Sequence, residues 1–162
     1  MPSITKSLVA AAVLALGLNA QVVQAQTVRL TTVLSGANEA PDRILTGGTG
    51  TAEVFVDLAS KSITYAIKIF NLPSGTRAGH FHVGGPGVAG PVVIDLTPPF
   101  DASNDYELNG TVTQSMFRAR PEIGIRDMDD FIQSLVGGQA YLNIHTAVYG
   151  AGEIRGQLTV AP

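Results

Sequence analysis

The chain has 162 residues, no cysteine, and a formal charge of −3 from 13 acidic and 10 basic residues. Without cysteine it forms no disulfide, performs no thiol catalysis and offers no thiolate to an iron–sulfur cluster or another metal. Without a basic cluster it lacks the positive surface that neutralises phosphates, so we expect no nucleic-acid partner.

The first 25 residues have the order of charge, apolar core and cleavage site that is typical of a secretory signal peptide. Lys6 supplies the charge, residues 8–18 are apolar, and Val23-Gln24-Ala25 is the small-residue cleavage site. The apolar stretch is shorter than the roughly 20 residues that a spanning helix needs. We expect cleavage after Ala25, with retention as an anchor as the alternative, and a secreted or periplasmic protein without a membrane span.

The remaining residues, 26–162, read as one all-β domain, because short runs of β-branched and apolar residues alternate with turn residues. The regular spacing of these runs predicts an antiparallel Greek-key β-sandwich or barrel. A chain of this size can bury enough apolar surface to fold without disulfides. The expected strands are residues 28–34, 50–58, 62–70, 78–83, 91–96, 108–117, 139–146 and 153–160.

One short helix is expected near residues 127–136, where apolar residues recur at helical spacing. These residues are Met128, Phe131, Ile132, Leu135 and Val136. Asp127 is placed to cap the start of the helix, and Gly137 is placed to end it. Asp127, Asp129 and Asp130 also suggest calcium, but the loop ligands that would complete a calcium site are missing, so capping is the preferred interpretation.

The chain has three histidines, and all of them lie in strand-like segments. Alternate residues of a strand share a face, so His80 and His82 point to the same side. By the same rule His145 shares its face with Tyr141 and Asn143. If the two strands are neighbours, the three imidazoles converge on one metal ion. Imidazole suits copper and zinc, and copper(II) binds more tightly than zinc at a given site.

The histidines also fit a metal-free protein, in which they are solvated or hydrogen-bond to nearby loops. Strand faces and the glycine-rich loop 84–91 would then contact a protein or glycan of the cell envelope. The sequence has no nucleophile elbow, phosphate-binding loop or zinc-protease helix motif, and its carboxylates are scattered, so a hydrolase is not expected. No residue is assigned a catalytic role, and the sequence leaves open whether the three histidines meet.

Three segments in chain order resemble the CHRD domain, the module named after chordin. Their sequences are LSGANEAP at residues 34–41, AGHFHVG with GPVV between residues 78 and 93, and YLNIHT with GEIRGQL between residues 141 and 158. The resemblance covers about residues 28–160 and implies a single CHRD domain in an exported protein. It fits least well from residue 101 to 126. The growth-factor antagonism of chordin is not carried over to this chain.

A more distant similarity is to the copper,zinc superoxide dismutases, which combine a Greek-key barrel with a His-x-His strand and a later strand histidine at copper. It implies that the three histidines bind copper, or else zinc. It also implies that Arg155, on the outward face, corresponds to an arginine that guides superoxide, with Asn143 and Tyr141 beside the site. The chain lacks the bridging histidine, the zinc ligands and the disulfide of those enzymes. Copper handling or a redox role is the leading expectation, and superoxide consumption is the enzymatic alternative.

Overall fold

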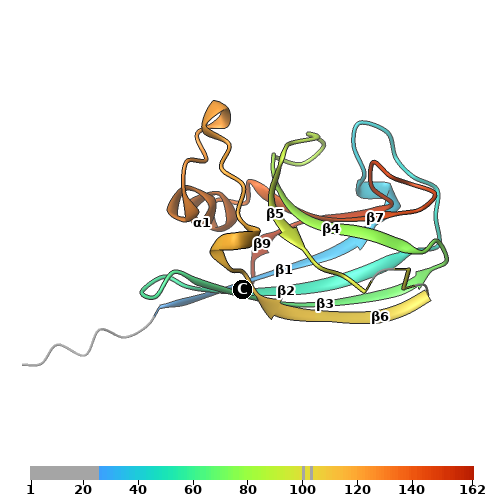
Figure 1. Cartoon of the computed structure of the whole chain (residues 1–162), viewed down its shortest axis with the longest axis horizontal. Coiled ribbons are helices and arrows are strands. Elements are labelled where there is room, and N and C mark those ends of the chain that lie inside the picture. Colours follow the sequence, from blue (N-terminus) through green and yellow to red (C-terminus); the bar gives the residue numbers. More distant parts are fainter. Residues whose placement is uncertain (1–25, 100, 103) are drawn as a thin grey trace, which may run out of the picture.

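A computed structural model describes residues 26–99, 101–102 and 104–162 of the chain. The expected signal peptide, residues 1–25, lies outside the described residues, so its cleavage and the export of the protein stay predictions. Within the described residues the regular secondary structure is mainly β-strand, with one short α-helix (Figure 1). The all-β prediction is confirmed.

The elements follow one another in this order: β1 (Thr27–Ser35), the 3-10 helix η1 (Gly36–Asn38), β2 (Thr49–Asp57), β3 (Ser62–Leu72), β4 (Thr76–Val83), β5 (Val92–Leu96), β6 (Asn104–Thr111), the 3-10 helices η2 (Gln114–Met116) and η3 (Pro121–Ile123), α1 (Met128–Val136), β7 (Ala140–Thr146), β8 (Ile154–Gln157) and β9 (Thr159–Val160).

The strands form one curled antiparallel sheet in the order β5-β4-β7-β8-β1-β2-β3-β6, with β9 beside β1. The chain crosses from β3 to β4, returns from β5 to β6, and crosses again to β7, which is a Greek-key pattern. In Figure 1, β4, β5 and β7 lie over β1, β2, β3 and β6, so the curled sheet makes the two layers of a sandwich. The predicted architecture is therefore the observed one.

The core lies between these layers because alternate residues of most strands are apolar and point inward. Val54 on β2 pairs with Leu30 on β1 and Tyr65 on β3, and all three side chains are buried. From the other layer Phe81 meets Tyr65 edge to face, with ring centroids 6.1 Å apart. Burying one such side chain contributes roughly 1.5–3 kcal/mol to folding.

Helix α1 begins where the sequence predicts, because the Asp127 carboxylate accepts a hydrogen bond from the backbone N–H of Asp130 at 3.0 Å. Phe131 is buried and lies 6.3 Å from the ring of Phe81, so the helix covers one end of the core. Asp130 and Asp129 form ion pairs with Arg126 and Lys61, which supports the capping interpretation. No helix in the described part of the chain is long and apolar enough to cross a membrane.

Six expected strands agree with the observed ones to within two residues at each end, and two do not. The strand expected at residues 108–117 is β6, which ends at Thr111, because Thr111 pairs with Thr64 and the partner strand β3 begins only two residues earlier, at Ser62. The strand expected at 153–160 is divided at Leu158, where the chain leaves β7 and pairs with β1 instead. In both cases the hydrogen-bonding partner sets the end of the strand.

Candidate metal centre

Strands β4 and β7 are neighbours in the sheet, and their register brings the three histidines together. His82 pairs with Tyr141, His80 pairs with Asn143, and Ala78 pairs with His145. Residues paired across two strands point to the same face. The histidines therefore share the outer face of the layer formed by β4, β5 and β7. The intervening apolar side chains Phe81, Leu142 and Ile144 are buried in the core.

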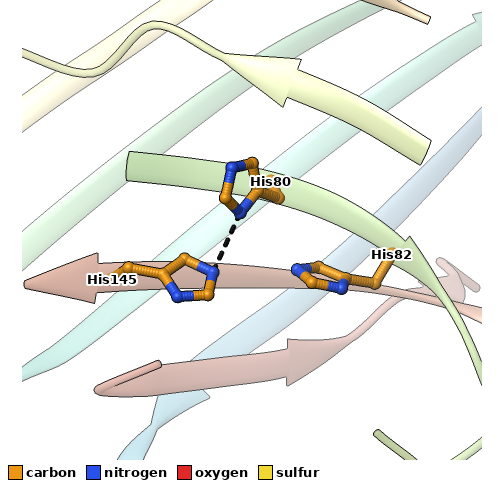
Figure 2. A group of neighbouring side chains, drawn as sticks. All are labelled: His80, His82 and His145. Atoms are coloured by element: carbon orange, nitrogen blue, oxygen red, sulfur yellow. Dashed lines mark hydrogen bonds between the residues drawn. The ribbon is translucent and has the colours of Figure 1, made fainter. Parts of the chain in front are cut away.

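The three imidazoles converge on a small volume above the sheet (Figure 2). One nitrogen from each ring lies within 4.8 Å of the nitrogens from the other two. His80 Nδ1 and His145 Nε2 are 2.9 Å apart. The ring centroids of His80 and His82 are 5.5 Å apart, and those of His82 and His145 are 5.9 Å apart. The strand neighbourhood that the sequence analysis assumed is present.

Backbone carbonyls fix two of the three histidine tautomers. His82 Nδ1 lies 2.9 Å from the carbonyl oxygen of Gly90, and His145 Nδ1 lies 3.1 Å from that of Gly150. A carbonyl can only accept, so both Nδ1 atoms carry the hydrogen and donate it. Both Nε2 atoms therefore carry a lone pair on the side where the rings meet, and a histidine ligand to a metal ion is commonly oriented by a hydrogen bond of this kind from its other nitrogen.

His80 has the opposite orientation. Its Nδ1 faces the other two rings and donates a hydrogen bond to His145 Nε2, because that nitrogen carries a lone pair. Its Nε2 lies 3.5 Å from Asp95 Oδ1 on the neighbouring strand β5. A tautomer with the hydrogen on Nε2, beside this carboxylate, would leave Nδ1 free as a third donor.

Burial keeps the histidines neutral. His82 and His145 are 7% and 8% exposed, and the His80 side chain is 18% exposed. Loss of hydration lowers the pKa of His80 to about 4 and that of His82 to about 4, and it also lowers the pKa of His145. Neutral imidazole is the form that binds a metal ion. His82 Nε2 is buried and has no hydrogen-bond partner among the described residues.

Two glycine-containing loops supply the carbonyls. In the β4–β5 loop, a side-chain carbon on Gly90 would lie 1.8 Å from the carbonyl oxygen of Val83, so only glycine allows this close approach. In the β7–β8 loop, Gly152 has φ of +133° and lies against Asn143, where a side-chain carbon would come within 2.6 Å. Gly90, in the glycine-rich loop that the sequence predicts at residues 84–91, and Gly152, which the sequence analysis did not single out, thus let both loops lie on the histidine face.

Tyr141 lies between the histidines and Arg155. Its ring stacks on His82, with centroids 4.7 Å apart and planes at 10°, and its hydroxyl donates to the carbonyl oxygen of Gly90 at 3.1 Å. The Arg155 guanidinium carbon lies 3.4 Å from the centre of the Tyr141 ring. Strand β7 separates β4 from β8, so the three groups form one stack. Arg155 shares the outer face but is covered, with 2% exposure.

A family model described as the CHRD domain matches residues 30–158, which is most of the chain. The chain belongs to the CHRD domain family. The match includes all three histidines and runs through the segment 101–126, where the resemblance was expected to be weakest. Searches of curated proteins and of solved structures each found no significant match.

Two carboxylates of this CHRD domain lie next to site residues that the sequence predicts, His80 and Asn143, but the sequence analysis did not single them out. Asp95 pairs across the strands with His80, and its other oxygen accepts a hydrogen bond from Arg118. Glu39, far away in the sequence, accepts a hydrogen bond from Asn143 Nδ2 at 3.2 Å. No local pattern marks either residue, because both reach the site through the pairing of distant segments. The strand register identifies Asp95, whereas Glu39 follows η1 and is identified only by its contact with Asn143.

Proposed function

We propose that this CHRD protein binds one metal ion, with copper favoured over zinc, through His80, His82 and His145. The observation that carries the proposal is the convergence of three imidazole nitrogens within 4.8 Å of one another. Two of these imidazoles already have their other nitrogen held by a backbone carbonyl. Hydrogen bonds of this kind orient a histidine ligand and raise its basicity.

The donor set would be Nε2 of His82, Nε2 of His145 and Nδ1 of His80. Three neutral nitrogens suit copper or zinc and do not suit calcium or magnesium, which take oxygen ligands. The buried and unpartnered lone pair on His82 Nε2 supports this choice, because leaving such an atom without a partner costs about 1–3 kcal/mol. Bound copper would supply a one-electron redox couple, whereas bound zinc would not.

The protein's own groups would hold the ion and limit access to it. Tyr141 and the Gly90 loop enclose His82, and the β7–β8 loop encloses His145, while His80 is the most exposed of the three. An ion would therefore be reached from the His80 side. Together with the expected signal peptide, this arrangement suits a secreted or periplasmic protein that handles copper or performs a simple redox role.

The test is elemental analysis and copper(II) titration of the purified protein beside a variant with all three histidines changed to alanine. We expect one tightly bound ion in the parent protein and none in the variant. Asp129→Asn, on helix α1, is the matched control, because it removes a surface carboxylate and should leave affinity unchanged. Equal, weak binding by all three proteins would refute metal binding and favour a metal-free module that contacts an envelope partner.

A further inference from the structure

A second polar site lies on the far side of Tyr141 from the histidines. It is a cleft of about 450 Å³ between β1, the loop that follows it, and the β4–β5 loop. Volumes of this order accommodate small-molecule ligands. We call it the Arg155 cleft, because the Arg155 guanidinium lies in its wall. Among the residues that line the cleft are Glu39, Arg43, Arg155 and Gln157.

Arg155 is held rigidly in this wall. One of its nitrogens, Nη2, donates to the carbonyl oxygen of Gly85 at 3.0 Å, and its plane rests on the ring of Tyr141. Within the described residues, no carboxylate forms an ion pair with Arg155 or with the exposed Arg43 at the rim. Glu39 acts on Arg155 only through its charge, without an ion pair. A pre-oriented guanidinium that forms no ion pair is well suited to bind the carboxylate of a ligand.

Glu39 and Gln157 add hydrogen-bond acceptors to the same cleft. Glu39 is 7% exposed, and only its Oε2 is used, by Asn143; its Oε1 is buried without a partner in the part of the chain described. Gln157 uses its amide hydrogens on backbone carbonyls, and its Oε1 is likewise buried and unpartnered. Acceptors of this kind call for a ligand that brings hydrogen-bond donors.

The charge of the cleft favours an anion. Arg155 and Arg43 contribute two positive charges. Burial raises the pKa of Glu39 to about 7, against the opposing effect of the hydrogen bond from Asn143, so near neutral pH this carboxyl group carries only part of a negative charge, and Oε1 is an acceptor in the ionised form. The summed charge of Arg155, Arg43 and Glu39 is therefore positive. An apolar part of the lining, made by Val33, Pro41 and Pro86, offers contact to a short carbon chain.

We propose that the Arg155 cleft binds a small hydroxycarboxylate anion, whose carboxylate pairs with Arg155 and whose hydroxyl group donates to Glu39 Oε1. This ligand matches the guanidinium, the unpartnered acceptor and the positive charge together. A neutral polyol would leave the guanidinium unpaired, and a simple dicarboxylate would bring no donor to Glu39. The proposal does not depend on metal binding, because Tyr141 separates the cleft from the histidines.

The direct test is calorimetric titration of the metal-free protein at pH 7 with malate, with succinate, which lacks the hydroxyl group, and with erythritol, which lacks the carboxylates. We expect saturable binding of malate at one site, about tenfold weaker binding of succinate, and none of erythritol. The variant without histidines should bind malate as the parent does, so metal chelation is not the cause. Absence of saturable malate binding, or equal affinities for malate and succinate, would overturn the proposal.

Variants locate the site. Arg43→Ala, at an exposed position, should lower the affinity for malate and for succinate about threefold. Arg29→Ala removes an exposed arginine of β1 that pairs with Glu53 and should change neither affinity. Glu39→Ala should reduce the affinity for malate to that for succinate. Arg155→Met should lower malate affinity more than tenfold. If this variant does not fold, the affinities of Glu39→Ala and Arg43→Ala for malate test whether the ligand binds in this cleft. Malate binding unchanged in both of these would place it elsewhere and refute the assignment.

Discussion

His82 and Tyr141 stack face to face across neighbouring strands, with ring centroids 4.7 Å apart and planes at 10°. The tyrosine hydroxyl also bonds to both the N–H and the carbonyl oxygen of Gly90, and that same carbonyl accepts the hydrogen of His82 Nδ1. Tyr141 therefore sets both the ring plane of the proposed ligand and the position of the group that fixes its tautomer.

Removing the hydroxyl and removing the ring of Tyr141 should have graded effects on copper affinity. Tyr141→Phe keeps the stack and loses the bonds to Gly90, so we expect a loss of about tenfold or less. Tyr141→Ala loses both the stack and the bonds to Gly90. Its copper affinity should fall by close to 100-fold, the upper end of the range of about 10- to 100-fold that is typical when a group that orients a metal ligand is removed. Competition titration against a copper chelator measures the difference. A Tyr141→Phe loss larger than that of Tyr141→Ala would contradict this role.

Asp95→Asn tests the orientation of His80. The carboxylate lies 3.5 Å from His80 Nε2 and favours a hydrogen there, so its loss should lower copper affinity by about 10- to 100-fold. It should also lower the pKa of His80 further, because the Asp95 charge opposes the effect of burial on that pKa. NMR titration of the ring would show this shift. Glu107→Gln, an exposed carboxylate paired with Lys68, is the control and should change neither quantity.

The metal-free protein should lose stability as the pH falls from about 6.5 to about 4. The folded-state pKa values of His80 and His82 are about 4, below the ordinary value of 6.5, so the unfolded chain takes up protons first. Protonation then favours unfolding. For each histidine, the free energy of unfolding falls by at most about 1.4 kcal/mol per pH unit. Above pH 6.5 the full stability is present. Urea denaturation at pH 7.5, 5.5 and 4.5 measures the trend.

The variant without histidines is the control for this pH dependence. If the buried imidazoles cause it, the variant should show a flatter profile over the same range, and the difference between the two proteins should grow as the pH falls. The same slope in both proteins would assign the effect to other groups.

Phe81 supports the site from the core side of the same strand. Its ring is fully buried between Tyr65 and Phe131, so Phe81→Ala should lower the free energy of unfolding by about 3–5 kcal/mol. Phe70→Ala, at a side chain that is 40% exposed, should cost much less. Urea denaturation of both variants at neutral pH compares them, and equal losses would show that Phe81 is not a central core residue.

Much of this arrangement could be predicted from the sequence because it depends on local periodicity. Alternation along a strand placed His80 and His82 on one face, and His145 on the same face as Tyr141 and Asn143. Helical spacing and a capping aspartate placed α1. These features need only neighbouring residues, and the structure agrees with them.

The rest depends on which segments meet, and a single sequence does not encode that locally. The pairing of β4 with β7 had to be assumed, the contact of Asp95 with His80 follows from the pairing of β4 with β5, and the contact of Glu39 with Asn143 depends on the position of the loop that follows η1. The burial of Arg155 also went unforeseen, because loops rather than strands cover the outer face. The end of β6 also depends on another segment: β6 ends where its partner strand β3 begins, although the sequence after Thr111 continues to alternate.

The most direct test of the central claim is long-range ¹H–¹⁵N NMR of the three histidine rings during anaerobic titration with copper(I). We predict that all three rings change together and saturate at one equivalent, with the metal at Nε2 of His82 and His145 and at Nδ1 of His80. Rings that remain unchanged at one equivalent, or that change independently and only in excess metal, would contradict a shared three-histidine site.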